Sequence, residues 1–88
     1  MIKIVYNLTL QFTGKDTIVI EGLEKLVATS ALGEANVIAQ EYLDKLEATL
    51  EKIETGKNGL IRIGSEIFSV TVDNIPRISV HVIATGTI

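Results

Sequence analysis

The stretch from Glu34 to Glu54 most constrains the fold, because it is the only long run with the periodicity of an amphipathic helix. At about 100° per residue, apolar residues spaced by three and four line a single helical face. Glycines follow the stretch, and Gly33 precedes it, as is typical of helix ends. We therefore predict one long helix that covers a sheet with an apolar stripe of Ala39, Leu43, Leu46, Leu50 and Ile53, widened by Ala35 and Tyr42.

The size of the chain predicts a single domain over residues 1–88, without room for a second core. So small a domain is marginal alone, and the sequence contains no cysteine for disulfides or for a cysteine zinc site. Hydrophobic residues make up 47% of the chain. Because a small domain exposes much of its surface, this excess predicts contact with further subunits and hence a homo-oligomer.

The charge distribution disfavours nucleic acid as a partner. The net charge is −3, and the eight Lys and Arg residues are scattered without a basic cluster. No segment approaches the roughly 20 apolar residues of a membrane span. The first ten residues alternate like a strand and lack a cleavage site for a signal peptide. A cytoplasmic protein without a membrane partner is the resulting expectation.

The N-terminal half predicts a β-hairpin and then a short helix. Residues 2–12 alternate between apolar and polar side chains, and 17–20 form a β-branched second strand. A three-residue loop would pair Phe12 with Ile18 and Leu10 with Ile20, which keeps all four on one face. Residues 23–31 have helical spacing, and whether Leu23 to Glu54 forms one helix or two stays open at Gly33.

The C-terminal half predicts three further strands. Residues 60–63 form a short strand, and a two-residue Gly64-Ser65 turn would set Ile61 opposite Phe68 in the next strand. In that strand Phe68, Val70 and Val72 alternate with polar residues. A loop containing Pro76 leads to a last strand at 78–83, which the tail could extend. The predicted pairs between these two strands are Val72–Ile78 and Val70–Val80. The expected fold is an α+β two-layer sandwich, with a mostly antiparallel five-stranded sheet in the order β-β-α-β-β-β and the helices packed on one face.

The polar side chains form no recognisable catalytic, cofactor-binding or metal site, and we predict none. His81, the only histidine, has no partner nearby in sequence that would complete a triad. Arg62 and Arg77 could bind an anion together only if the fold brings them together. An exposed acidic row on one flank of the helix is a candidate recognition strip, although a solvated flank is the simpler interpretation: Asp44, Glu47, Glu51 and Glu54.

These features favour a non-enzymatic protein-interaction module, a homo-oligomer that binds and inhibits a larger protein, as small accessory proteins of bacteria and phages do. The alternative is a protein that binds a nucleotide or metabolite, in a pocket between subunits or between helix and sheet. Val37 and Ile38 lie off the main helical stripe and need another partner. The candidate interface comprises these two residues and the predicted outer face of the sheet: Val5, Val19, Val37, Ile38, Ile67, His81 and Ile83. An edge strand that pairs with its equivalent in another subunit is the alternative interface.

Overall fold

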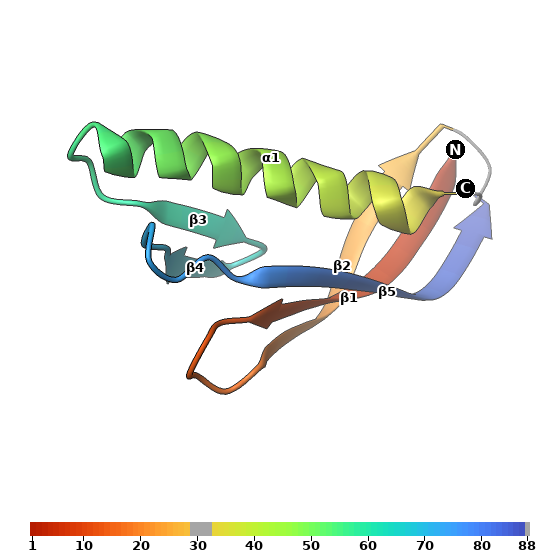
Figure 1. The fold of residues 1–88 in the computed structure, drawn as a ribbon. Helices are drawn as coiled ribbons and strands as arrows, with labels where there is room; N and C mark the ends of the chain where they lie inside the picture. The colour runs from red at the N-terminus through yellow and green to blue at the C-terminus, as the bar shows by residue number, and fades with distance from the viewer. Residues whose placement is uncertain (29–32, 88) are drawn as a thin grey trace.

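The computed structural model describes residues 1–28 and 33–87. Its elements are, in chain order, β1 (Ile2–Gln11), β2 (Ile18–Val27), α1 (Glu34–Glu54), β3 (Leu60–Ile63), β4 (Glu66–Ser69) and β5 (Arg77–Thr87). The molecule is elongated, with extents of 43 × 25 × 21 Å. The helix α1 runs along its length, over β3 and β4 at one end and over the longer strands at the other (Figure 1).

The strands form two separate antiparallel sheets. One sheet has three strands in the order β2-β1-β5, and the other is the β3-β4 hairpin. The α+β class and the antiparallel pairing are confirmed, but the single five-stranded sheet is wrong. Because β5 pairs with β1 rather than with β4, the predicted pairs Val72–Ile78 and Val70–Val80 do not form.

The backbone after β4 explains why β5 has a different partner. The Val70 N–H donates to the Gly59 carbonyl at 2.8 Å, which continues the β3–β4 ladder. Thr71 and Asn74 then form an isolated bridge that turns the chain sharply. β5 begins only at Arg77, and the ten residues of β1 offer it a longer ladder than the four residues of β4. The β3–β4 turn itself is as predicted, with Ile61 opposite Phe68.

β2 is longer than predicted, because it continues through Val27 where a short helix was expected. The part of that predicted helix over 29–32 lies outside the described residues. A β-bulge opposite Asn7 interrupts the ladder; Gly22 adopts φ 69° there and its N–H donates to Asn7 Oδ1 at 3.2 Å. The bulge shifts the alternation by one residue. The partly buried positions of β2 are consequently Ile18, Ile20, Leu23, Lys25 and Val27.

The β1–β2 hairpin has the predicted facing but a different register. Leu10 pairs with Ile18 and Leu8 with Ile20, two residues away from the predicted partners. A shift of two residues leaves every side chain on the same face. The three-residue loop is therefore wrong, and the chain between Leu10 and Ile18 is longer. Val19 lies on the outer face, as expected from the alternation.

The helix α1 has the predicted bounds, but its buried face is rotated by roughly 60°, taking about 100° per residue. Gly33 precedes it at φ 87°, and at its end the Gly56 N–H donates to the Ile53 carbonyl at 2.9 Å. Leu43, expected in the middle of the stripe, is 39% exposed, and Ile38, expected beside it, is only 1% exposed. The residues buried along α1 are Glu34, Ile38, Tyr42, Leu46 and Thr49.

The core lies where the alternating side chains of β1 meet this helical face. Tyr6 on β1 and Tyr42 on α1 are both buried, and their hydroxyl oxygens are 3.1 Å apart in a hydrogen bond. Burial, and then the hydrogen bond with Tyr42, raise the pKa of Tyr6 well above its ordinary value of 10.0. The buried apolar residues are Ile4, Tyr6, Leu8, Leu10, Phe12, Ile38, Tyr42, Leu46, Ile61, Ile63 and Val70.

One side chain ties the two loops at the far end of β1 and β5 together. Asn74 Oδ1 accepts a hydrogen bond from the Thr13 N–H at 3.0 Å, and Asn74 Nδ2 donates to the Thr13 carbonyl at 3.2 Å. The amide group thus satisfies both backbone groups of one residue, much as a neighbouring strand would. This contact fixes the β1–β2 loop against the segment that enters β5.

Candidate functional site

The strand β5 presents an edge that no other strand covers within the described residues. It pairs with β1 along one side only. Between Ile78 and Thr87 it carries no proline, lysine, arginine, aspartate or glutamate. Natural edge strands are normally protected from further pairing by lysines, prolines or bulges. Only a bulge at Ile83 interrupts this edge, so the regular part extends from Arg77 to Val82.

The opposite edge of the same sheet, at β2, is protected. It contains the bulge at Gly22, and two of its three charged side chains, Glu24 and Lys25, are engaged in ion pairs. Lys3 on β1 pairs with Glu24 at 3.1 Å, and Lys25 pairs with Glu41 on α1. Charges and a bulge both discourage the addition of a strand. The two edges therefore differ in kind, and β5 is the one suited to pairing.

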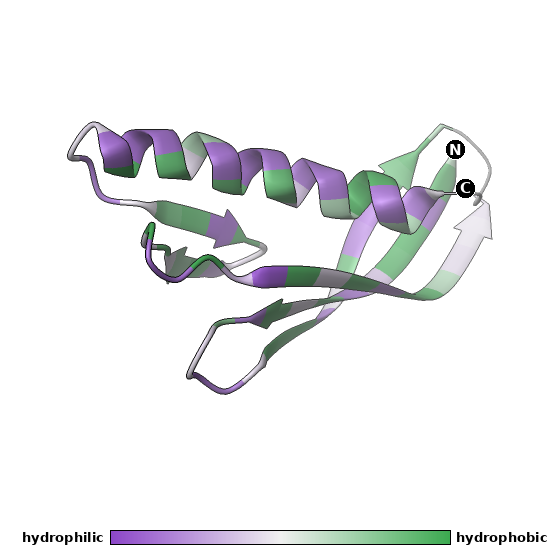
Figure 2. Ribbon diagram, viewed as in Figure 1, coloured by the Kyte–Doolittle hydropathy of each residue, from purple (hydrophilic) through white to green (hydrophobic). Residues whose placement is uncertain are grey.

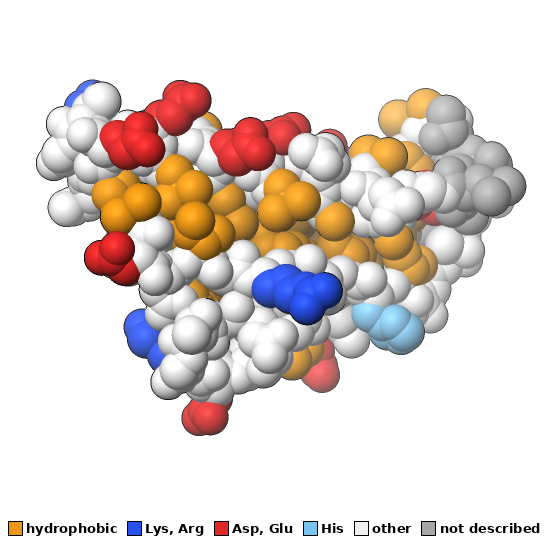
Figure 3. All heavy atoms as spheres, viewed as in Figure 1, with side chains coloured by type: hydrophobic (Ala, Val, Ile, Leu, Met, Phe, Trp, Pro, Cys, Tyr) orange, Lys and Arg blue, Asp and Glu red, His pale blue; other side chains and the backbone are white. Residues whose placement is uncertain are grey.

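An apolar band runs beside the free edge of β5. On the strand, Ile78, Val80 and Val82 face the core but are only partly buried. On α1, Leu43 and Leu50 lie between the buried face and the row of carboxylates, as the helical spacing requires. Figure 3 shows this band of apolar side chains along the underside of the helix. The hydropathy colouring places the same apolar stripe on the side of α1 that faces the strands (Figure 2).

The acidic residues of α1 form the upper rim of this band (Figure 3). All four carboxylates of the candidate strip are exposed, and none makes a salt bridge within residues 1–28 and 33–87. Asp44 accepts a hydrogen bond from Gln40 Nε2 at 2.9 Å. The strip is therefore solvated in the isolated chain: Asp44, Glu47, Glu51 and Glu54.

Only some of the predicted interface residues lie on the outer face of the three-stranded sheet, the face opposite α1. Val5 lies on the central strand β1 and is partly buried. Its partner on β5 is Ala84, which follows the half-exposed Ile83. His81 is exposed on the same face, opposite Asn7. Val19 lies there as well, but farther along the sheet. The exposed Leu26 also belongs to this face; its assignment to a helix hid it from the sequence interpretation.

The remaining interface candidates lie elsewhere. Ile67 is 62% exposed but belongs to the separate β3–β4 hairpin. Val37 is 54% exposed on α1, whereas Ile38 is part of the core and offers no accessible surface. The free edge of β5 was missed because the sequence interpretation paired this strand with β4. The absence of charged residues from Ile78 onward was the signal that could have revealed it.

Two pockets separate the basic residues that the sequence analysis considered as a pair. Arg62 lines a pocket of about 290 Å³ between α1 and β3, together with Lys45 and Lys52. Arg77 lines a different pocket, of about 450 Å³, with Lys15. His81 lines neither, so these three residues do not converge on one site.

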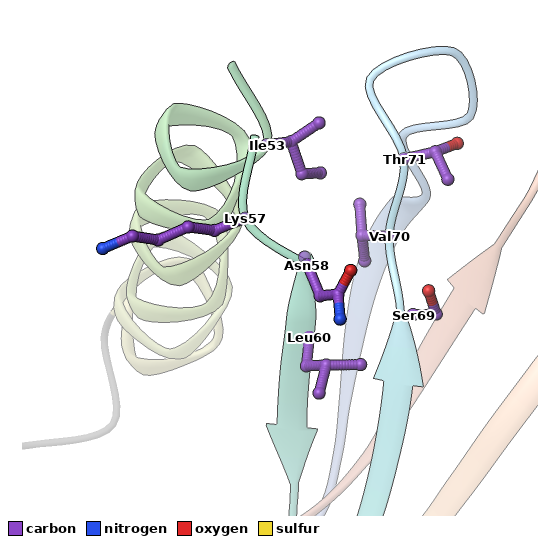
Figure 4. A pocket seen from close by; sticks show the side chains of 8 residues that line it. Ile53, Lys57, Asn58, Leu60, Ser69, Val70 and Thr71 are labelled. Carbon is purple, nitrogen blue, oxygen red and sulfur yellow. The ribbon is translucent and has the colours of Figure 1, made fainter. Parts of the chain in front are cut away.

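A further pocket, of about 420 Å³, lies where the end of α1 meets β3 and β4. Figure 4 shows Ile53, Val70 and Leu60 around it, with the Asn58 amide among them and the Lys57 side chain extending away. Such a lining offers apolar contact, an amide and the hydroxyls of Ser69 and Thr71, but no acid–base pair. Within the described ranges, no group of three or more His, Cys, Asp or Glu side chains is arranged to hold a metal ion.

No helix among the described residues is both long and apolar enough to span a membrane. Comparison with family models, with curated proteins and with solved structures gave no match for this chain.

Proposed function

We propose that this chain is a non-enzymatic protein-interaction module that acts through the free edge of β5 and the apolar band beside it. The observation that carries the proposal is the contrast between the two sheet edges. β2 is protected by a bulge and by ion pairs, whereas the edge of β5 from Arg77 to Val82 is regular and almost uncharged. A strand added there gains main-chain hydrogen bonds along the whole edge.

Side chains of the added strand would supply specificity. Alternate side chains would point towards α1 and contact the apolar band, where Leu43 is 39% exposed. The next side chains would point to the outer face. The biological role that we propose is that of a homo-oligomeric accessory protein of the bacterial or phage type, which binds a larger protein in the cytoplasm and inhibits it.

The experiment that tests this proposal places a charge on the edge. In Val80→Lys an inward-pointing lysine opposes the addition of a strand, as in naturally protected edges. The control is Ile67→Lys, because Ile67 is also a β-branched apolar residue and lies on β4, away from this edge, although it is more exposed than Val80. We expect Val80→Lys to lose both self-association and capture of a host protein, and Ile67→Lys to retain them. If Val80→Lys is folded and retains both, the edge is not the binding surface.

A small anionic ligand is the second candidate function, and the pocket between α1 and β3 favours it. Its lining includes Lys45, Lys52 and Arg62 and contains no carboxylate, although the chain as a whole is acidic. Three cations around one pocket suit a phosphate-bearing nucleotide or metabolite. A ligand that binds the folded state must raise the melting temperature. A phosphate-compound panel that shifts the wild type but not Arg62→Gln would support this function, and no shift with any compound would exclude it.

A further inference from the structure

We propose that the first occupant of the β5 edge is a second copy of the chain, paired antiparallel about a two-fold axis at Val80. This inference rests on the proposed function, since it requires the edge to be a binding surface. It adds the identity of the partner strand and the register of the pair. The resulting dimer would contain one continuous sheet of two copies of the β2-β1-β5 order.

The sequence of β5 is self-complementary in this register. A two-fold axis at Val80 sets Val80 opposite its own copy and Ile78 opposite Val82 of the partner subunit. These three residues are the partly buried, inward-facing positions of the strand, so every inward pair is apolar. On the outer face, Ser79 would lie opposite His81 of the partner subunit. Cross-strand pairs of this kind are the unit of sheet stability.

The neighbouring registers are less favourable. An axis at His81 would oppose two histidines, and it would extend the pairing into the bulge at Ile83. An axis at Ser79 would place Arg77 opposite His81 of the partner subunit and would set the buried Pro76, which has no N–H to donate, against Val82. Only the axis at Val80 gives three apolar inward pairs without opposing two basic side chains.

The apolar surface that the single chain leaves exposed favours a second copy at the β5 edge. An 88-residue domain buries a limited share of its surface, and large hydrophobic residues remain exposed, including Leu43 beside the β5 edge. Pairing of one strand per copy is a small interface. Interfaces below about 1,200 Å² are typical of weak complexes, so we expect dissociation in the micromolar range.

Cysteine substitutions can test the register, because the chain contains no cysteine of its own. In the proposed dimer, Val80→Cys places two thiols directly opposite each other, within the reach of a disulfide. We expect it to form a covalent dimer at least tenfold faster than Ile67→Cys, the exposed control on β4. Ser79→Cys and His81→Cys should cross-link poorly alone but readily when mixed, because residue 79 faces residue 81 of the other copy.

Sedimentation of the unmodified chain provides the second measurement, independent of any substitution. We expect a monomer–dimer equilibrium between about 1 and 500 μM. A monomer throughout, with Val80→Cys no faster than Ile67→Cys, overturns the proposal, and fastest cross-linking of His81→Cys alone overturns the register. If self-association is absent but Val80→Lys still abolishes capture of a host protein, only the second copy is refuted. If Val80→Lys is folded and leaves capture intact, the proposed function fails as well.

Discussion

The buried pair of tyrosines makes the stability of this protein depend on pH in a specific way. The hydroxyl oxygens of Tyr6 and Tyr42 are 3.1 Å apart in the core between β1 and α1. Replacing Tyr6 with Phe removes one partner and leaves the Tyr42 hydroxyl without it. Loss of one partner of a buried hydrogen bond costs about 1–3 kcal/mol. We expect Tyr6→Phe to lower the free energy of unfolding by about 1.5 kcal/mol at pH 8.

The sign of the pH effect follows from the raised pKa of Tyr6. Above pH 10.0, its ordinary pKa, the unfolded chain loses the Tyr6 proton while the folded chain retains it. Folding then binds a proton, so the wild type loses stability as the pH rises, by about 1.4 kcal/mol per pH unit. The Phe variant has no such proton. The two proteins should therefore become about equally stable near pH 11.

Urea unfolding followed by far-UV circular dichroism, at several values between pH 8 and pH 11, measures this difference. The effects of ionisable groups distant from Tyr6 are common to both proteins and cancel in the comparison to first order. Tyr42→Phe and the double variant complete a cycle, in which the coupling should be about 0.5–1.5 kcal/mol. A stability difference that stays constant up to pH 11 would refute the reasoning, because Tyr6 would then titrate at its ordinary pKa.

Three substitutions test the backbone arrangement by thermal unfolding. Asn74→Ala removes both hydrogen bonds to Thr13 and should lower the free energy of unfolding by about 1 kcal/mol, or the melting temperature by about 4–8 °C. An unchanged melting temperature would show that the loops do not depend on this contact. Gly22→Ala should cost about 1–2 kcal/mol although its methyl group meets no atom, since φ is 69° at the bulge; a neutral result would mean that the bulge relaxes. Gly59→Ala should cost about 1–3 kcal/mol, because its methyl group would lie 2.5 Å from the Val70 carbonyl oxygen. In the control Gly86→Ala the methyl group meets no atom, so this variant should be as stable as the wild type. Equal effects of the two substitutions would contradict the close packing at Gly59.

The sequence was sufficient to predict those features that depend on residues close together in the chain. The bounds of α1 follow from its spacing and from the glycines around it, and the structure reproduces them at Glu34 and Glu54. The β3–β4 register follows from the two-residue turn at Gly64. In both cases the deciding residues lie within a few positions of the feature that they determine.

Other features depend on contacts between distant residues, and the sequence did not determine them. The alternation of β5 is equally compatible with β1 or β4 as a neighbour, because a strand pattern records which face is apolar and not which strand lies beside it. The end of β2 resembled a helix because a charged residue, Lys25, lies on its inner face and an apolar one, Leu26, on its outer face. The buried face of α1 differs from the predicted one because apolar residues cover more of the helix surface than the core requires. Leu43 could therefore remain partly exposed.

The prediction of the candidate site was limited in the same way, because part of that site depends on contacts between distant residues. Val5, His81 and Ile83 share the outer face of the sheet because alternation alone determines that placement. The open edge of β5 depends instead on the order of the strands, which only the folded chain reveals. The three cations around the pocket between α1 and β3 were likewise separated in sequence and could not be grouped before the helix was placed against the hairpin.

The position of β1 at the centre of its sheet also has a consequence for biosynthesis. One neighbour, β2, follows it at once, but the other, β5, is the last strand in the described chain, so Ile2 pairs with Thr87. On the ribosome, the apolar face and one hydrogen-bonding edge of β1 would remain without their final partner until β5 has left the exit tunnel. Such non-local pairing slows folding and exposes nascent chains to aggregation. We expect the hairpin of β1 and β2 to require protection by chaperones until β5 has been synthesised.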